Sequence, residues 1–416
     1  MEVLHGNWPH VPLGKVFKTT SGGTPLSSRE EYYEGGTIPW INSGELGVPF
    51  IGKAEHYLTI EGLQSSSAKM LPVDSVLIAM YGATAGKASL LKMPACVNQA
   101  ICAVLPNKTY SSLFLKYYID TIYYYLVSLS SGSARSNLSQ EVIRNIKIPF
   151  PDLPTQLRIA GVLGSIDEKI ELNRKKIAEL EALAKTIYDY WFVQFDFPDK
   201  NGKPYKSSGG KMVWNDLLKR EVPEGWEVGN LYTIADFENG LACQRFRPKG
   251  DEASLPVIKI REMHDGINHD TERVSANIPA KHRIADGDLL FSWSASLEAM
   301  IWCGGTGGLN QHIFKVTPRG EYSVEYVYRQ LASYIVTFAK MAEARKTTMG
   351  HITADHIKQS RIILPSDEIL SRFATGIKPI FDRRIFLRRE IRVLEEQRDT
   401  LLPLLMNGQV EVRGEK

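Results

Sequence analysis

The chain has 416 residues, of which 43% are hydrophobic, and its 50 basic and 47 acidic residues leave a formal net charge of +3. The length predicts two or more domains with ordinary buried cores, and the near balance of charge neither indicates nor excludes a nucleic-acid partner. The four cysteines form no Cys-x-x-Cys pair, which argues against a disulfide framework and favours a reducing cytoplasm. The sequence contains neither an apolar run of about 18 residues nor a secretion-signal pattern at its first residues, so neither a membrane span nor export is expected.

Residues 1–152 predict a mixed α/β domain. In chain order, the expected elements are strands at 38–41, 73–81, 100–105 and 146–150 and a tyrosine-rich helix at 112–129. The strand at 73–81 runs into a tight glycine turn, 82–87, and a polar loop at 131–137 precedes the last strand. The domain then leads directly into the longest helical pattern in the chain.

Residues 153–192 predict one long helix with a narrow apolar stripe. Its seam residues alternate in steps of four and three, which is the heptad pattern of a coiled coil. They are Ile159, Leu163, Ile166, Ile170, Asn173, Ile177, Leu180, Ala184 and Ile187. Roughly 35 helical residues span about 50 Å, and so long a helix with so narrow a stripe needs a partner helix. Asn173 is expected to set the register of that pairing at some expense of stability.

The partner helix is predicted within the same chain, at 366–406. Its seam follows the first at a nearly constant offset and consists of Phe373, Ile377, Ile380, Leu387, Ile391, Leu394, Leu401 and Leu405. Arg384 and Arg398 interrupt this second seam, so the match is imperfect. The tail 407–416 begins with Asn-Gly, which is a typical helix stop.

Between the helices, residues 193–224 are rich in Pro, Gly, Ser and Lys and predict a linker. Residues 225–365 then repeat the first domain in outline. The corresponding stretches are 255–260 and 38–42, 286–291 and 73–78, and the pairs Asn310-Gln311 and Asn98-Gln99. An internal repeat of this length predicts two copies of one scaffold, and the recurring Asn-Gln pair favours a shared structural hydrogen-bonding role.

The expected fold class is therefore α/β (α+β). Two similar globular domains are separated by two long antiparallel helices that form a coiled coil, with pseudo-two-fold symmetry. The framework positions repeat while the polar loops differ; the glycine turn 82–87, for example, corresponds to the unlike stretch 293–298. Because loops on a rigid scaffold usually carry recognition, one scaffold with two loop sets predicts two different binding surfaces.

A search for catalytic motifs finds little. The turn 82–87 resembles a phosphate-binding loop, but only three residues separate its glycines, and Ala88 replaces the hydroxyl residue that would bind Mg²⁺. The nine histidines show no metal-ligand spacing, and neither a nucleophile elbow nor the Asn/Asp-Pro-Pro-aromatic motif of amino-methyltransferases is present. The acidic stretch 196–199 has no convincing nuclease lysine after it. The chain is predicted to do no chemistry by itself and to hold no metal and no cofactor.

Basic and polar residues of the loops predict contacts with nucleic acid. Arg and Asn can make bidentate bonds to guanine and adenine edges, whereas Lys and Thr more often hold phosphates. For any single residue, a solvated surface side chain is the competing interpretation. The candidates are Thr24, Arg29, Tyr32, Asn42, Lys87, Arg135, Asn137, Arg245, Arg247, Lys259, Arg261, Arg345, Lys346, Thr347, Thr348 and His351.

Several motifs accompany the two-fold repeat. They are Ile148-Pro-Phe-Pro151 followed by Gln156-Leu-Arg-Ile159, Tyr190-Trp-Phe-Val-Gln-Phe-Asp196, Val222-Pro-Glu-Gly-Trp226, and Leu401-Leu-Pro-Leu-Leu-Met-Asn-Gly-Gln409. On these motifs the chain resembles, over essentially its whole length, the specificity subunits of Type I restriction–modification enzymes. The second copy departs from the first at its helix start, where Ser366-Asp-Glu stands in place of Leu153-Pro-Thr-Gln.

The resemblance implies a non-catalytic subunit that binds double-stranded DNA and reads one half of a bipartite, asymmetric site with each domain. It implies that the paired helices set the unread spacer and dock two methyltransferase (M) subunits. S-adenosylmethionine would be bound by those subunits, and ATP and Mg²⁺ by separate restriction (R) subunits. Two alternatives stay open: a self-sufficient DNA methyltransferase or nuclease, and a coiled-coil scaffold that joins two protein-binding domains without DNA.

Overall fold

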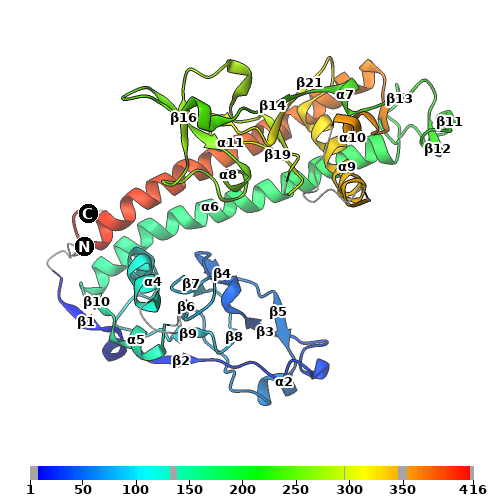
Figure 1. The fold of residues 1–416 in the computed structure, drawn as a ribbon. Helices are drawn as coiled ribbons and strands as arrows, with labels where there is room; N and C mark the ends of the chain where they lie inside the picture. Colours follow the sequence, from blue (N-terminus) through cyan, green and yellow to red (C-terminus); the bar gives the residue numbers. More distant parts are fainter. Residues whose placement is uncertain (1–7, 132–137, 295, 345–353, 413–416) are drawn as a thin grey trace. The chain divides into compact units, whose positions relative to one another are not determined.

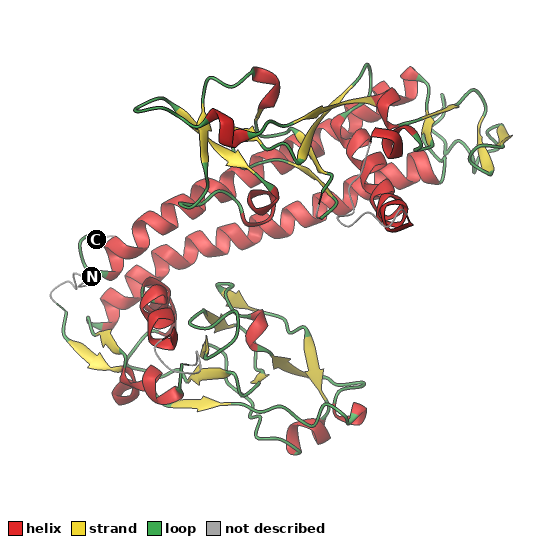
Figure 2. Cartoon of the chain, viewed as in Figure 1, coloured by secondary structure: helices red, strands yellow, loops and turns green. Residues whose placement is uncertain are grey.

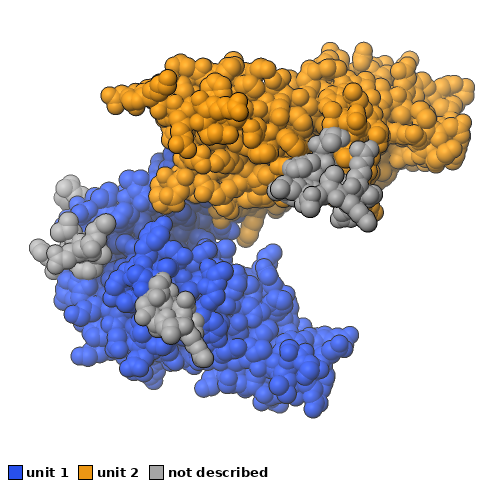
Figure 3. Space-filling model, in the orientation of Figure 1, with its two compact units in different colours: residues 1–171, 394–416 blue, residues 172–393 orange. Residues whose placement is uncertain are grey.

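The computed structural model describes residues 8–131, 138–294, 296–344 and 354–412 (Figure 1). Short strands and two very long helices dominate the secondary structure (Figure 2). The chain divides into two compact units, which Figure 3 colours separately. Unit 1 comprises residues 1–171 and 394–416, and unit 2 comprises residues 172–393. Each unit therefore contains one end of each long helix.

Unit 1 is built on a five-stranded sheet with the order β2-β9-β6-β7-β4. The bounds are β2 Thr19–Ser21, β9 Ile101–Val104, β6 Val76–Ala79, β7 Ala88–Leu91 and β4 Phe50–Ile51. A three-stranded sheet, β5-β3-β8, and the pair β1-β10 complete it: β5 His56–Leu58, β3 Ile38–Ile41, β8 Cys96–Val97, β1 His10–Pro12 and β10 Lys147–Pro149. The helices are α1 Leu13–Val16, α2 Ile60–Gln64, α3 Ser112–Thr121, α4 Tyr123–Ser131 and α5 Gln140–Asn145, with 3-10 turns η1 Glu30–Tyr32 and η2 Ser43–Glu45.

Unit 2 contains two four-stranded sheets, β14-β21-β18-β19 and β16-β15-β20-β17. The bounds are β14 Ala235–Asn239, β21 Ile313–Pro318, β18 Leu289–Ser292, β19 Glu298–Ile301, β16 Arg273–Ser275, β15 Ser254–Ile258, β20 Gly307–Leu309 and β17 Arg283–Ile284. The two-stranded elements are β13 Glu227–Gly229 with β22 Ile362–Leu364, and β11 Met212–Asn215 with β12 Arg220–Pro223. The helices are α7 Leu231–Ile234, α8 Ile260–Asp265, α9 Val324–Ala344 and α10 Ala354–Lys358, with 3-10 turns η4 Cys243–Phe246 and η5 Ala280–His282.

The predicted internal repeat is confirmed, because the two units share one strand order. The order β2-β9-β6-β7 of unit 1 recurs as β14-β21-β18-β19 in unit 2, and β5-β3-β8 recurs as β16-β15-β20. In both units the middle strands β6 and β18 are buried along their whole length. Val76 and Ile78 belong to one core of unit 1, while Leu77 and Ala79 belong to another. A strand covered on both faces reads as a continuous apolar run, which explains the pattern at both places.

Single hydrogen bonds and close approaches repeat as well. The backbone N–H of Asn98 donates to the carbonyl of Ile41 at 3.1 Å, and the N–H of Asn310 donates to that of Ile258 at 3.0 Å. A Cβ at Gly22 would lie 1.6 Å from the carbonyl oxygen of Val97, and a Cβ at Gly240 would lie 2.1 Å from that of Asn310. Only glycine fits so close an approach of two backbones, so both copies need it at the same framework position.

The two long helices pair as the heptad pattern predicts. Helix α6 spans Leu153–Tyr188 and continues as a short π-helical turn, Asp189–Val193, whereas α11 spans Asp367–Met406. In unit 1, Ile159 and Leu163 of α6 share a core with Leu405 of α11. In unit 2, Ala184 and Tyr188 of α6 share a core with Phe373 of α11. The start of each helix thus packs with the end of the other, which makes the pairing antiparallel.

The tyrosine-rich helix predicted at 112–129 is two helices, α3 and α4, rather than one. The break falls at Ile122, whose φ of −96° and ψ of 15° leave the helical region. Immediately before the break, the hydroxyl of Thr121 donates to the carbonyl of Tyr117 at 2.9 Å. A threonine that bonds back in this way competes with the helix ladder and bends it.

The segment predicted as a linker, 193–224, is folded onto unit 2. It carries the hairpin β11-β12, and the rings of Phe195 and Phe197 lie 5.6 Å and 5.2 Å from that of Trp226. Both phenylalanines are buried. The Pro, Gly and Lys content of the segment is typical of a linker, but its aromatic residues supply enough apolar surface to join the core.

Candidate nucleic-acid interface

In unit 1, several predicted residues meet where strands β3 and β8 end. The hydroxyl of Thr24 donates to Gln99 Oε1 at 2.5 Å, and Asn98 Nδ2 donates to Asn42 Oδ1 at 3.1 Å. The backbone N–H of Asn42 in turn donates to Glu45 Oε1 at 2.7 Å, which closes a capping box over η2. Asn42 and Asn98 are half-buried and Gln99 is exposed. Amide groups held at such loop ends can present hydrogen bonds to the edges of bases.

Lys87 lies beside the same segment. The hydroxyl of Thr84 in its turn donates to the carbonyl of Ser43 at 2.8 Å, and the Lys87 stem passes so close to Gly47 that a Cβ there would lie 2.8 Å from Cδ. Lys87 is exposed and forms no ion pair with a described residue. We call Thr24, Asn42, Thr84, Lys87, Asn98 and Gln99 the polar cluster of unit 1.

Arg29 and Tyr32 lie at η1, outside the polar cluster of unit 1. Arg29 Nη1 is 3.0 Å from Glu31 Oε1, and both side chains are exposed. The hydrogen bond and charge of Glu31 raise the pKa of Arg29, but an exposed pair of this kind adds little stability. Tyr32 is half-buried, and its carbonyl accepts from the N–H of Thr59 at 3.0 Å. The charge of Arg29 is thus already matched within unit 1.

In unit 2 the predicted basic residues divide into paired and unpaired ones. Lys259 Nζ is 2.5 Å from Glu272 Oε1, and Arg261 Nη2 is 2.6 Å from Glu262 Oε1. Arg245 and Arg247, at and beside η4, are exposed and form no ion pair with a described residue. The two unpaired guanidinium groups are therefore the stronger candidates for an anionic partner.

Seven predicted residues lie outside the described part of the chain. They are Arg135, Asn137, Arg345, Lys346, Thr347, Thr348 and His351.

Sequence reasoning missed a polar group of unit 2 that takes the place of the polar cluster of unit 1. Trp293 Nε1 donates to Asn239 Oδ1 at 3.2 Å, and its ring lies 5.7 Å from that of the exposed His312. The pair Asn310-Gln311 marks this place after β20, as Asn98-Gln99 does after β8. The predicted structural role of the asparagine is confirmed, because its Oδ1 accepts from the N–H two residues later in both units, at 3.0 and 3.3 Å.

Comparisons with known proteins agree with this architecture. A family model described as the Type I restriction modification DNA specificity domain matches residues 5–182. The specificity subunit of the Type I restriction enzyme MjaIX from Methanocaldococcus jannaschii is 26% identical, over 98% of this chain and 94% of that protein. The chain is therefore similar, over almost its whole length, to Type I restriction–modification specificity subunits.

Two further proteins extend the comparison. The HindI specificity subunit of Haemophilus influenzae is 24% identical over 70% of this chain and 74% of that protein. The crystal structure of a Type I specificity subunit from M. genitalium matches 96% of both chains with a TM-score of 0.60 and 15% identity, which shows a shared fold. The matching family model describes a DNA specificity domain, and both relatives are specificity subunits of Type I restriction enzymes.

Among the described residues, no group of three or more His, Cys, Asp and Glu side chains could hold a metal ion. No helix within the described ranges is long and apolar enough to cross a membrane.

We expect Lys87→Ala to weaken the binding of this chain to duplex DNA and to reduce the salt slope of log K by about one, because one phosphate contact is lost. Fluorescence anisotropy on one duplex at several salt concentrations measures both quantities. Lys92→Ala is the matched control, since Lys92 is an exposed lysine of unit 1 outside the proposed contact residues and already pairs with Asp74. An unchanged salt slope in Lys87→Ala would mean that Lys87 is a solvated surface side chain and does not contact a phosphate.

Buried charges join the long helices to the domains of the chain. In unit 1, Asp167 of α6 is fully buried; it accepts from the hydroxyl of Tyr117 at 2.7 Å and from Arg398 Nη1 at 3.1 Å. In unit 2, Arg384 of α11 donates to Glu325 at 2.7 Å and to Glu181 at 3.1 Å. Arg384 and Arg398, expected as interruptions of the seam, are therefore the partners of buried or half-buried acids.

The polar seam residue Asn173 also finds its partner across the helix pair. It is fully buried, and its Nδ2 donates to Glu390 Oε2 at 2.8 Å. A buried amide with one specific acceptor favours a single alignment of two helices, so this contact agrees with the predicted role of Asn173 in setting the register.

Two carboxylates of unit 2 are held in their charged form. Burial alone would raise the pKa of Glu181, but the hydrogen bond from Arg388 and the charge of Arg384 outweigh it and lower that pKa. Burial likewise opposes the charge of Asp286, but the N–H of Gly305 and the guanidinium groups of α11 outweigh it and lower that pKa as well.

The pKa values of these carboxyl groups are lower in the folded state than in the unfolded state. The two carboxylates therefore stabilise unit 2 at pH values above their unfolded-state pKa of about 4. That stability is lost as the pH falls through the folded pKa. We expect unit 2 of the wild type to lose stability between pH 5 and pH 3, as estimated from the unfolded carboxyl range, and Asp286→Asn to lose less over this interval. Urea denaturation at several pH values measures the difference. Equal acid dependence in both proteins would contradict the proposed role of Asp286.

Proposed function

We propose that this chain is a specificity subunit that reads a bipartite, asymmetric site on double-stranded DNA, one half with each β-rich domain. One observation carries the proposal: the two domains repeat a framework down to single hydrogen bonds, yet present different side chains at equivalent loop positions. A shared scaffold gives each domain the same way of approaching a duplex, and unlike side chains give each domain different base contacts.

We propose a role for each segment of the chain. Residues 1–152 and 225–365 are the two target-recognition domains, and 153–192 and 366–406 are the helices that set the spacer and dock partners. Residues 193–224 connect the halves, and 407–416 form the tail. The fully buried Asn173 and Asp167, each bonded to a residue of the partner helix, support a helix pair with one fixed register.

We also propose the residues that meet the DNA. In unit 1 these are Thr24, Asn42 and Lys87 of the polar cluster, together with Arg29 and Tyr32. In unit 2 they are Arg245, Arg247, Lys259 and Arg261. The sequence adds Arg135, Asn137, Arg345, Lys346, Thr347, Thr348 and His351 to this proposed set. Lys87, Arg245 and Arg247 have the strongest support, because each is exposed and forms no ion pair with a described residue.

The proposed partners are two M subunits and the R subunits of one complex in the cytoplasm. We assign S-adenosylmethionine to the M subunits, and ATP and Mg²⁺ to the R subunits.

Deleting one heptad from each long helix is expected to alter the length of the DNA spacer or to abolish assembly with the M subunits, because the proposed role of the helices is to set the spacer and to dock these partners.

Exchanging residues 1–152 for the corresponding domain of another specificity subunit tests whether each domain recognises its own half of the site. The expected result is a methylated target that changes in one half only, because residues 225–365 still read the other half. Methylome sequencing of the host reports both halves at once. A change in both halves would contradict the assignment of one half-site to each domain.

A further inference from the structure

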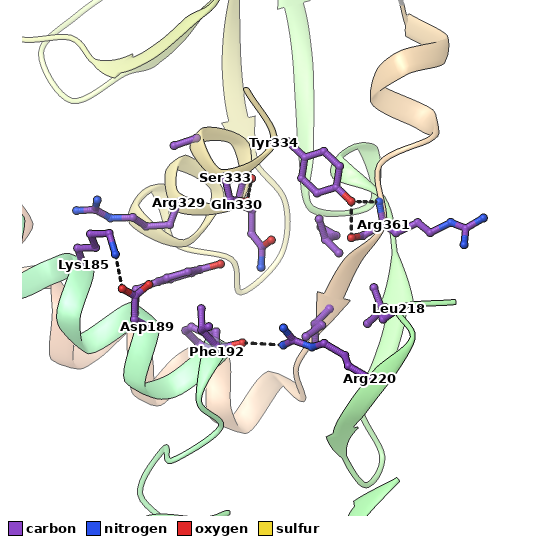
Figure 4. A pocket seen from close by; sticks show the side chains of 15 residues that line it. Lys185, Asp189, Phe192, Leu218, Arg220, Arg329, Gln330, Ser333, Tyr334 and Arg361 are labelled. Atoms are coloured by element: carbon purple, nitrogen blue, oxygen red, sulfur yellow. Dashed lines mark hydrogen bonds and ion pairs between the residues drawn. The ribbon is translucent and has the colours of Figure 1, made fainter. Parts of the chain in front are cut away.

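A pocket of about 570 Å³ lies in unit 2 (Figure 4). The end of α6, the strand β12, helix α9 and the strand β22 surround it. Its walls are mainly apolar and include Phe192, Val193, Leu218, Ile362 and Ile363. None of the residues proposed to contact DNA lines this pocket, so its polar lining needs a separate explanation.

The central polar group of the pocket is the guanidinium of Arg220, which Figure 4 shows directed toward Phe192. Its Nη2 donates only a long hydrogen bond, 3.5 Å, to the Phe192 carbonyl, and its buried Nε finds no acceptor among the described residues. The guanidinium also stacks on the ring of Phe195 at 4.6 Å. Burial lowers the pKa of Arg220. A half-buried cation without a carboxylate partner in the described chain is unusual, because burying an unpaired charge is costly.

The other charges at the pocket are already matched or point elsewhere. Lys185 forms an ion pair with Asp189, and Arg329 Nε is 2.8 Å from Glu325 Oε1. Arg361 donates to the carbonyl of Leu217 at 3.0 Å, and Figure 4 shows its guanidinium directed away from the pocket. Arg220 is therefore the cation of this lining that can accept an anionic guest.

A second donor lines the same pocket. Tyr188 is only 7% exposed, and its hydroxyl makes no hydrogen bond with any residue that the structure describes. Burial raises the pKa of Tyr188, so the hydroxyl keeps its proton and can donate it in a hydrogen bond. Gln330, also 7% exposed, lines the pocket next to these groups. The Tyr188 hydroxyl, which has no acceptor in the described chain, and the half-buried Arg220 guanidinium, which has no carboxylate there, line one pocket and point to the same missing group.

We propose that this pocket receives a carboxylate of the methyltransferase partner, borne by an acidic side chain with apolar neighbours, which Arg220 and Tyr188 bind together. The inference rests on the proposed function, since it takes a methyltransferase as the partner. A carboxylate matches the forked donors of arginine, and the apolar walls match the flanking residues of a protein segment better than a hydrated inorganic anion. A pocket of about 570 Å³ admits a side chain, whereas a DNA duplex cannot enter it.

The test measures the affinity of the full chain for its purified cognate methyltransferase by titration calorimetry. Arg220→Gln is expected to raise the Kd about 30-fold or more, because it leaves the partner carboxylate without its cation. Tyr188→Phe is expected to raise the Kd about tenfold, because it removes one hydrogen bond to a charged group. Lys203→Gln, which removes an exposed charge from the same segment outside the pocket, is the matched control and is expected to leave the Kd unchanged.

Each outcome decides the proposal. Tyr188→Phe keeps the fold, because the lost hydroxyl has no partner in the described chain, so it remains informative even where Arg220→Gln unfolds. An unchanged Kd in Tyr188→Phe and in folded Arg220→Gln would overturn the inference. Hexanoate that binds the wild-type chain through Arg220 without competing with the methyltransferase would also overturn it, in favour of a small organic acid.

The same experiment separates this inference from the proposed function. If the pocket variants bind the methyltransferase normally and the complex still methylates a split site, the inference fails and the proposed function stands. If the wild-type chain binds no methyltransferase at all, both fail.

Discussion

Phe373→Ala will lower the unfolding free energy of unit 2 by about 3–5 kcal/mol, because it leaves a cavity in an aromatic core. The ring of Phe373 is 1% exposed, and its centroid lies 4.9 Å from that of Phe192 and 5.6 Å from that of Trp191. These contacts join the start of α11 to the end of α6, so the variant also loosens the helix pair within this unit. Urea denaturation followed by tryptophan fluorescence measures the loss, since five of the seven tryptophans belong to unit 2.

The same helix supplies the control. Phe386 also belongs to α11, but its side chain is 54% exposed, and Phe386→Ala should change the stability by no more than about 0.5 kcal/mol. Comparable losses in the two variants would mean that helix propensity, rather than the core around Phe373, determines the stability of this pairing.

Arg384→Met is expected to destabilise unit 2 by about 3–5 kcal/mol, because it leaves buried carboxylate charge undercompensated. The Arg384 side chain is 5% exposed and that of Glu325 is 1% exposed, and Nη1 lies 2.7 Å from Glu325 Oε2. Arg329 remains as a second partner of Glu325, at 2.8 Å from Oε1. Thermal or urea unfolding of the full chain measures the loss.

Two further variants test the cause of this loss. Arg383→Met removes the neighbouring exposed arginine and should change the stability by no more than about 0.5 kcal/mol. Adding Glu325→Gln to Arg384→Met should recover part of the loss, because the buried acid is then neutral. Additive effects of the two changes would show that Arg384 and Glu325 do not stabilise one another.

The sequence predicts the architecture well, because it is set by periodic apolar patterns. The four-three rhythm locates both long helices to within a few residues, and the matched strands at 73–78 and 286–291 reveal the repeat. The spacing of buried residues along an element depends only on its own geometry. A single chain can therefore carry that information without any knowledge of its contacts.

The parts that escaped prediction depend on contacts between distant segments. Neither Asp167 nor Glu181 belongs to the predicted apolar seam of the first long helix, yet both bond to arginines of α11. The sequence did contain a signal for these contacts. Those arginines interrupt the apolar seam of α11, and an arginine buried in a seam needs an acidic partner. The folding of Phe195 and Phe197 onto Trp226 was hidden for a related reason, since linker composition outweighed two aromatic residues.

The candidate site was the least predictable part. By residue type alone, all six cations of the predicted set that the structure describes are equally good candidates for DNA contacts. Arg29, Lys259 and Arg261 each pair with an acid in their own unit. Lys87, Arg245 and Arg247 form no ion pair with a described residue. Which cations remain unpaired depends on the paths of loops, and loop paths carry no period in the sequence. The same limit hid the pairing of Trp293 with Asn239.

We propose that two unlike domains on one scaffold read the two halves of one DNA site. Methylome sequencing of a host that expresses this chain with its cognate methyltransferase, with and without residues 225–416, tests it most directly. We expect a split motif with N6-methyladenine in both halves, which is lost or becomes symmetric on truncation. An unmethylated genome, despite a stable complex of the full chain with the methyltransferase, would contradict it.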